Sequence, residues 1–160
     1  MVTPHIETLC TLLAQVLGAR HLSLCTAESC TGGLISASCT QLSGSSAWFE
    51  RGFVTYSNAS KTDLLGVPAD LIARHGAVSQ EVARAMAAGA LTHAQAQLAV
   101  AVTGVAGPGG GSADKPVGTV WLAWCVGGRT WAQRHQFAGD RAAVRAATVL
   151  CAVQGLLRVA

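Results

Sequence analysis

Apolar positions recur along the first part of this chain in two different rhythms. Between Thr3-Pro4 and Gly18 they lie three and four residues apart, which predicts an amphipathic helix with a capped start. Residues 21–26 alternate apolar and polar side chains, as a half-buried strand does, and residues 34–39 return to a helical pattern. This part of the chain therefore predicts a helix, a strand and a second helix.

The rest of the chain continues this succession of helices and strands. The expected elements are a strand at 52–57, one or two short helices within 60–75, a helix at 80–93 capped by Ser79, a strand at 97–103, two strands at 117–126 and 129–137 joined by Gly127-Gly128, and a final helix from Gly139-Asp140. Helical crossovers impose parallel pairing, whereas a two-residue hairpin imposes an antiparallel pair. The order predicts an α/β fold: a single domain over residues 1–160, built as a three-layer α/β/α sandwich with a mixed, mostly parallel sheet and a C-terminal β-hairpin.

Composition adds expectations about partners. A chain of 160 residues buries roughly two thirds of its unfolded surface, enough for a hydrophobic core. With 51% hydrophobic and 12% charged residues, its surface is lean in charge, which favours an apolar face buried against a second copy in a homodimer. The net charge is +3 and the arginines are scattered, so no nucleic-acid partner is expected.

The cysteines and the apolar runs indicate the compartment. The six cysteines form no C-x-x-C pair, and most lie inside apolar runs, where a free thiol behaves as a small hydrophobe. No signal segment opens the chain, and its apolar runs look too short to span a bilayer. We therefore expect a cytoplasmic protein in a reducing compartment, with no membrane contact.

The first candidate site is the segment Ala27-Glu28-Ser29-Cys30-Thr31-Gly32-Gly33, where a strand is predicted to turn into a helix. The unpaired N–H groups at such a helix start can hold an anion or an oxyanion. The Ser29 hydroxyl is a candidate nucleophile, although serine is also an ordinary helix cap. The Cys30 thiol is a rival nucleophile that lacks an identifiable histidine partner.

A second candidate site follows the strand predicted at 52–57. It contains Tyr56, the only tyrosine, and Lys61, one of two lysines beside nine arginines. Lysine can act as a base when its surroundings lower its pKa, whereas arginine does not deprotonate in proteins. The alternative is that Lys61 is an exposed residue of a first helical turn and that Tyr56 is a core ring.

A glycine-rich stretch, 103–112, follows the buried strand predicted at 97–103, and its N–H groups are placed to cradle a phosphate or a ribose. It fits neither common nucleotide-binding loop, and a flexible surface loop is the alternative. Arg141, at the start of the last helix, is a candidate to neutralise a phosphate. The five histidines share no metal-ligand spacing, and Trp121, Trp124 and Trp131 are expected to be core or interface aromatics.

Six blocks taken together resemble one family, the CinA family, over its C-terminal domain and from about residue 5 to residue 157 of this chain. The blocks are Glu28-Ser29-Cys30-Thr31-Gly32-Gly33, Gly44-Ser45-Ser46, Tyr56-Ser57-Asn58 with Lys61, Thr103-Gly104-Val105-Ala106-Gly107-Pro108-Gly109-Gly110, Lys115-Pro116-Val117-Gly118-Thr119-Val120 and Gly139-Asp140-Arg141. The resemblance implies an α/β/α fold that tends to dimerise. It also implies hydrolysis of the carboxamide of nicotinamide mononucleotide to nicotinate mononucleotide and ammonia, by a serine mechanism without metal or cofactor.

The resemblance also implies roles for individual residues. Ser29 would be the nucleophile, Lys61 its base, and Tyr56 would assist them. N–H groups of the turn or of the strand end would hold the oxyanion, and glycine-loop amides with Arg141 would hold the phosphate. The expected substrate-binding residues are Cys30, Thr31, Gly32, Gly33, Thr103, Gly104, Gly107, Gly109, Gly110 and Arg141. Two alternatives are a noncatalytic nucleotide-binding module of a competence or DNA-damage response and a cysteine amidase that uses Cys30.

Overall fold

The computed structural model describes residues 3–160, which form helices and strands in the predicted order. The elements are α1 (Pro4–Arg20), β1 (Leu24–Glu28), α2 (Leu34–Thr40), the short 3-10 turn η1 (Ser45–Ala47), β2 (Phe49–Val54), α3 (Asn58–Leu65), α4 (Ala69–His75), α5 (Gln80–Thr92), β3 (Leu98–Gly104), β4 (Thr119–Val126), β5 (Arg129–Gln136) and α6 (Arg141–Val159).

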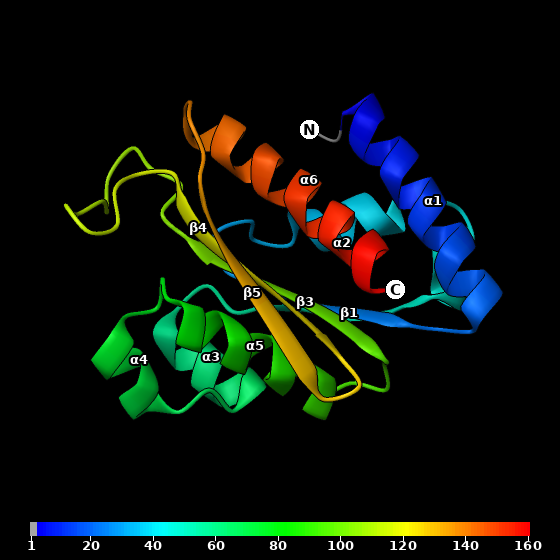
Figure 1. Cartoon of the computed structure of the whole chain (residues 1–160), viewed down its shortest axis with the longest axis horizontal. Helices are drawn as coiled ribbons and strands as arrows, with labels where there is room; N and C mark the ends of the chain where they lie inside the picture. The colour runs from blue at the N-terminus through cyan, green and yellow to red at the C-terminus, as the bar shows by residue number, and fades with distance from the viewer. Residues whose placement is uncertain (1–2) are drawn as a thin grey trace.

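The strands form one sheet between two layers of helices. Figure 1 shows α1, α2 and α6 on one face and α3, α4 and α5 on the other, which confirms the predicted three-layer sandwich. The strand order is β2-β1-β3-β4-β5. β1 pairs in parallel with β2 and β3, whereas β3–β4 and β4–β5 are antiparallel. The sheet is mixed as predicted but not mostly parallel, because the C-terminal hairpin adds as many antiparallel pairs as the helical crossovers add parallel ones.

Several predicted boundaries are shifted by two or three residues, and the cause is local capping. α1 continues past Gly18 to Arg20, and His21 ends it in a left-handed conformation, so β1 begins only at Leu24. At a second boundary, Ser57 accepts a hydrogen bond from the Ser60 N–H as the N-cap of α3. The strand before it, β2, spans Phe49–Val54 rather than 52–57, so it begins and ends three residues earlier than predicted.

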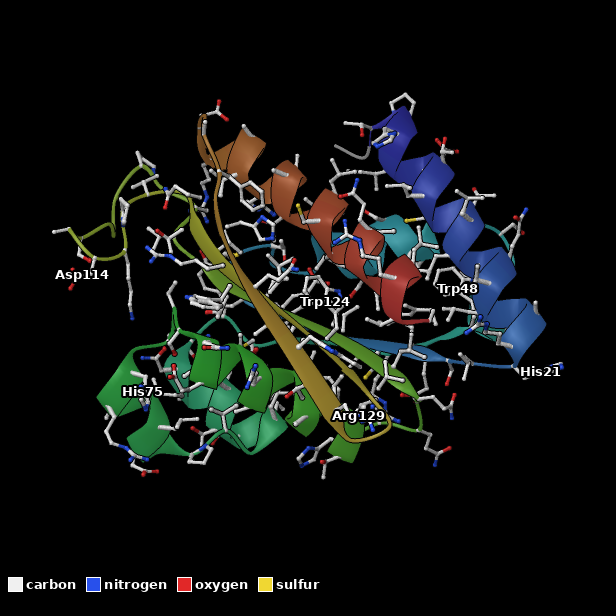
Figure 2. The ribbon with its side chains drawn as sticks, viewed as in Figure 1. His21, Trp48, His75, Asp114, Trp124 and Arg129 are labelled. Atoms are coloured by element: carbon white, nitrogen blue, oxygen red, sulfur yellow. The ribbon has the colours of Figure 1, made fainter. Side chains whose placement is uncertain are left out.

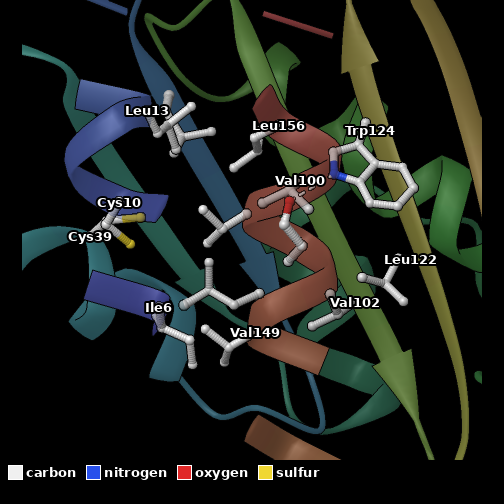
Figure 3. Close-up of a cluster of buried hydrophobic side chains, with 14 of the residues drawn as sticks. Ile6, Cys10, Leu13, Cys39, Val100, Val102, Leu122, Trp124, Val149 and Leu156 are labelled. Atoms are coloured by element: carbon white, nitrogen blue, oxygen red, sulfur yellow. Dashed lines mark hydrogen bonds between the residues drawn. The ribbon is translucent and has the colours of Figure 1, made fainter. Parts of the chain in front are cut away.

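The central strand β3 is buried on both faces and separates two hydrophobic clusters. On the side of α1 and α6, Val100 and Val102 pack among large side chains such as Leu13 and Leu156, as Figure 3 shows. On the side of α5, the strand contributes only Ala99 and Ala101, and the cluster there includes three alanines of that helix. The two helical layers therefore pack on the sheet through side chains of different size.

The helix α5 also contacts α3 at very short range. A Cβ built on Gly89 of α5 would lie 2.0 Å from the Leu65 carbonyl oxygen, which belongs to the last residue of α3. Side chains larger than hydrogen do not fit at this position, so the backbones of the two helices touch there.

One helix differs from expectation in length and polarity. Within residues 3–160, α6 is long and apolar enough, by length and composition, to cross a membrane, so the expectation that every apolar run is too short is wrong for this helix. Its apolar face, which includes Val144, Val149 and Val153, is buried in the cluster on the α1 side of the sheet. Core helices of globular domains meet the same criterion.

The three tryptophans of the hairpin have different surroundings. Trp124, labelled in Figure 2, lies in the core. Its ring N–H donates to the Ala152 carbonyl of α6 at 3.1 Å. Trp131 is 44% exposed, and Trp121 packs at the edge of the cluster on the α5 side. The prediction of a core aromatic is therefore confirmed for Trp124, and Trp131 lies at the surface.

The contact between Trp124 and α6 gives a test of the packing. Gly155→Ala should destabilise the protein by about 1–3 kcal/mol, because the added Cβ would lie 2.1 Å from the Trp124 ring. Helix propensity alone predicts the opposite, a gain of about 1 kcal/mol. The matched control is Gly18→Ala in α1, where nothing lies within 4 Å of the added carbon. Urea unfolding of both variants measures the difference, and equal stability would show that the Trp124 contact does not restrict α6.

Candidate active site

The candidate site is a cavity of about 280 Å³ at the carboxyl ends of β1 and β3. Open α/β sheets bind their ligands at this edge. Ten of the thirteen residues predicted for the site line the cavity: Ser29, Cys30, Tyr56, Lys61, Thr103, Gly104, Gly107, Gly109, Gly110 and Arg141. Asn58, Ala77, Val78, Val105 and Ala106 complete the lining. Thr31, Gly32 and Gly33 lie outside it.

Two of these side chains are in direct contact. The Lys61 Nζ lies 3.0 Å from the Ser29 Oγ, although 32 residues separate them in sequence. Ser29 follows β1, and Lys61 is on the first turn of α3, so the parallel pairing of β1 with β2 brings them to the same edge. Lys61 is only 1% exposed. The alternative of an exposed first-turn lysine is therefore wrong.

The surroundings of Lys61 favour its uncharged form. Its Nζ lies 2.8 Å from the Thr55 carbonyl oxygen and 3.4 and 3.5 Å from those of Tyr56 and Ser57. Within residues 3–160 no carboxylate forms an ion pair with it. Burial lowers the pKa of Lys61 from its ordinary value of 10.5. A neutral amine can donate its two hydrogens to these carbonyls and direct its lone pair at the Ser29 hydroxyl.

Sequence reasoning missed the residue that holds the nucleophile turn, Glu28. This carboxylate is fully buried and has no cationic partner among residues 3–160. At the turn and the start of α2, it accepts hydrogen bonds from the Thr31 hydroxyl at 2.6 Å, from the Gly33, Ile35 and Ser36 N–H groups at 3.1, 2.9 and 2.8 Å, and from the Ser36 hydroxyl at 2.7 Å. The Thr26 hydroxyl of β1 lies 3.4 Å from the same carboxylate. The signal in the sequence was a glutamate inside an otherwise apolar strand, directly before the turn.

The Glu28 network decides which N–H groups of the turn remain for a ligand. The Gly33 N–H is used by Glu28, and the Gly32 N–H donates to the Ser29 carbonyl at 3.0 Å. In the described part of the chain, the N–H groups of Cys30 and Thr31 have no acceptor. Of these two residues only Cys30 lines the cavity, so its N–H is the donor best placed for an oxyanion formed at Ser29.

The Cys30 side chain has a different environment from its N–H group. It is 5% exposed and packs in the hydrophobic cluster on the α1 side of the sheet. Burial raises the pKa of this thiol to about 11, so it stays protonated at neutral pH. These surroundings disfavour Cys30 as a nucleophile.

Arg141 links the remaining parts of the cavity wall. Its guanidinium donates to the Gly107 carbonyl at 2.9 Å and to the Tyr56 hydroxyl at 2.8 Å. Tyr56 is 59% exposed, so the alternative of a core ring is wrong. The contact of Tyr56 with Lys61 is made through its carbonyl, and its hydroxyl faces Arg141.

Comparison with known proteins places this arrangement in a family. Residues 6–160 match the family model described as the CinA C-terminal domain. The chain belongs to the CinA family. It is 57% identical over 154 residues to the nicotinamide-nucleotide amidohydrolase PncC of Pseudomonas putida, with 96% of each chain covered. The enzyme of the same name from Escherichia coli K12 is 48% identical over 157 residues, covering 98% of this chain and 95% of the relative.

A solved structure agrees with the CinA-family fold. The crystal structure of the competence/damage inducible protein CihA from Agrobacterium tumefaciens matches with a TM-score of 0.97 and 44% identity, covering 99% of this chain and 98% of that one. The resemblance to the CinA family predicted from the sequence blocks is thereby confirmed. Within residues 3–160 of this CinA-family chain, no group of three or more His, Cys, Asp or Glu side chains is arranged to hold a metal ion.

The Glu28 network predicts a large effect of one small substitution. Glu28→Gln should destabilise the protein by about 1–3 kcal/mol, because an amide nitrogen cannot accept from the N–H groups that each carboxylate oxygen now serves. The matched control is Glu50→Gln, which alters an exposed pair with Arg51 and should change stability by about 0–1 kcal/mol. Urea unfolding measures both variants. Equal effects at the two positions would mean that the Glu28 network does not stabilise the fold.

Proposed function

We propose that this chain hydrolyses the carboxamide of a nicotinamide nucleotide and releases ammonia. The observation that carries the proposal is the buried contact of 3.0 Å between the Lys61 Nζ and the Ser29 Oγ, which supplies a base for a serine nucleophile. Relatives that are 48–57% identical over nearly their whole length are named nicotinamide-nucleotide amidohydrolases, which supports the same chemistry.

In the first step, the neutral Lys61 amine takes the proton of the Ser29 hydroxyl while the Ser29 Oγ attacks the carboxamide carbon. The carbonyl oxygen becomes an oxyanion, which the Cys30 N–H is placed to stabilise. Such preorganised donors usually contribute strongly to acyl transfer.

In the second step, the Lys61 ammonium returns its proton to the carboxamide nitrogen, and the C–N bond breaks to release ammonia. An ester between Ser29 and the nicotinoyl group remains. A water molecule then gives a proton to Lys61 and attacks this ester, and the proton returns to the Ser29 Oγ as the carboxylic acid leaves. The sum is one amide and one water converted to one acid and one ammonia.

The cavity wall also suits the cationic pyridinium ring of a nicotinamide nucleotide. Tyr56 presents an exposed aromatic ring at the cavity, and such a ring attracts a cation to its face. A positive ring bound near Lys61 would further favour the neutral amine, because like charges repel. Ring binding and base activation therefore support one another.

The two neighbouring candidate nucleophiles can be separated by substitution. Ser29→Ala should lower the rate of ammonia release from nicotinamide mononucleotide by about 10³-fold or more, because the acyl group then has no acceptor. The matched control, Cys30→Ala, should remain active because its thiol lies in the core. Ammonia assays on the purified variants measure both rates. A fully active Ser29→Ala variant would falsify the serine mechanism, and substrate binding by the wild type without ammonia release would favour the noncatalytic module.

Activity should depend on the protonation of Lys61. Because the neutral amine is the reactive form, kcat/KM should fall as pH drops through the pKa of Lys61, and this apparent pKa should lie below 10.5. A pH profile of ammonia release measures it. Lys61→Arg should be inactive at every pH, because arginine does not deprotonate. The matched control is Lys115→Arg, at the only other lysine, which should leave the profile unchanged. Activity in Lys61→Arg with an unaltered profile would exclude Lys61 as the base.

A further inference from the structure

A second, larger cavity adjoins the candidate active site. Its volume is about 630 Å³, and it shares Ala106 and Arg141 with the candidate active-site cavity, so the two cavities lie side by side. Its other lining residues include Pro108 from the glycine-rich loop and Arg145 from α6. We call this space, lined by Arg141 and Arg145, the arginine cavity.

The arginine cavity has an excess of positive charge. Arg141 and Arg145 form no ion pair with any carboxylate of residues 3–160. The one acidic residue of the lining, Asp140, accepts a hydrogen bond from the Ala143 N–H at 2.9 Å as the N-cap of α6. The lining thus contains two guanidinium groups and one carboxylate, and that carboxylate is already hydrogen-bonded as a helix cap. The net positive charge suits an anion.

Several N–H donors of Arg145 have no hydrogen-bond partner among residues 3–160. Its guanidinium makes one hydrogen bond to the described residues, from Nη2 to the Thr31 carbonyl at 2.8 Å. Its Nε is buried and has no acceptor in residues 3–160. A guanidinium carries five N–H donors in a planar fork that matches phosphate oxygens. The remaining donors are therefore available for an anionic ligand.

Apolar residues on the cavity wall strengthen the attraction between the two arginines and an anion. Ala106, Pro108 and Val117 line the cavity beside the two arginines. Charge–charge interactions are stronger where apolar groups exclude water. A phosphate held there would interact with both guanidinium groups in surroundings less polar than the open surface.

We propose that the arginine cavity binds the 5′-phosphate of the nucleotide substrate and that Arg145 determines the preference for a phosphorylated substrate. This inference rests on the proposed function, which places the carboxamide at Ser29 and leaves the sugar phosphate to extend past Arg141. It adds the Arg145 side chain to the phosphate site, which was predicted from the sequence to consist of the glycine-loop amides and Arg141.

The hydrogen bond from Arg145 to the Thr31 carbonyl gives Arg145 a second role. Arg145 contacts both the phosphate cavity and the turn that carries Ser29. Arg145 is a specificity-determining residue through the phosphate and a positioning residue through the turn. The two roles differ experimentally, because loss of positioning affects every substrate, whereas loss of phosphate contact affects only phosphorylated ones.

Binding to a variant that cannot turn over tests the phosphate site directly. In the Ser29→Ala protein, calorimetry should show nicotinamide mononucleotide binding about 10- to 100-fold more tightly than nicotinamide riboside, which lacks the phosphate. Adding Arg145→Gln should remove most of this difference, because it should weaken binding of the mononucleotide much more than binding of the riboside. Arg158→Gln, an exposed position on the same helix, is the matched control and should preserve the difference. Inorganic phosphate should compete with the mononucleotide in the Ser29→Ala protein and not in the Arg145→Gln double variant.

The outcomes separate this inference from the proposed function. Equal binding of the two ligands, or equal weakening of both by Arg145→Gln, would overturn the phosphate site. Ammonia release by the otherwise wild-type chain is measured separately with both substrates. Its absence would overturn the proposed function, while the calorimetric result would still decide whether the arginine cavity recognises phosphate.

Discussion

The site depends on the way in which the backbone and side chain of Glu28 divide their hydrogen bonds. The carboxylate gathers the N–H groups at the start of α2 and so fixes the turn that presents Ser29. The backbone carbonyl of the same residue accepts from the Thr55 N–H at 2.8 Å, and the Thr55 carbonyl in turn accepts from Lys61. One residue at the end of β1 thus supports both the proposed nucleophile, Ser29, and the proposed base, Lys61.

The burial of Lys61 opposes stability and at the same time favours the neutral amine that the proposed mechanism requires. A lysine among carbonyl oxygens and apolar groups without a carboxylate is kept from its charged form, which water would otherwise favour. A salt bridge would stabilise the ammonium and abolish its use as a base. The structure instead places the amine where burial lowers its pKa and within hydrogen-bond distance of the Ser29 hydroxyl, an arrangement typical of positions where stability is given up for function.

The sequence predicted those parts of the molecule that depend on local pattern. Helix caps such as Ser79 and Asp140, the Gly127-Gly128 hairpin and the order of elements all follow from short-range chemistry, and the structure confirms them. The gathering of Ser29 and Lys61 at one edge followed from their positions at strand ends. Glu28 was missed because most of its partners are N–H groups of a helix start, which were predicted from the sequence to bind a ligand. The arrangement of Arg145 was missed because its partner carbonyl lies 114 residues away in sequence. The roles of the site residues remain predictions.

On the α5 side, β3 contributes only alanines to the hydrophobic cluster, and this affects the spacing between the Lys61 amine and the Ser29 hydroxyl. The helix that carries Lys61 does not rest on the sheet alone: its last residue touches the backbone of α5 at Gly89, and α5 in turn lies over the alanines of β3. The distance of the Lys61 amine from the sheet therefore depends in part on the backbone contact at Gly89 and on the alanines of β3, none of which has a side-chain rotamer that could change to compensate for a shift. A single methyl group added at Gly89, which does not line the cavity, would push α3 away from α5 and so move the Lys61 amine relative to the Ser29 hydroxyl.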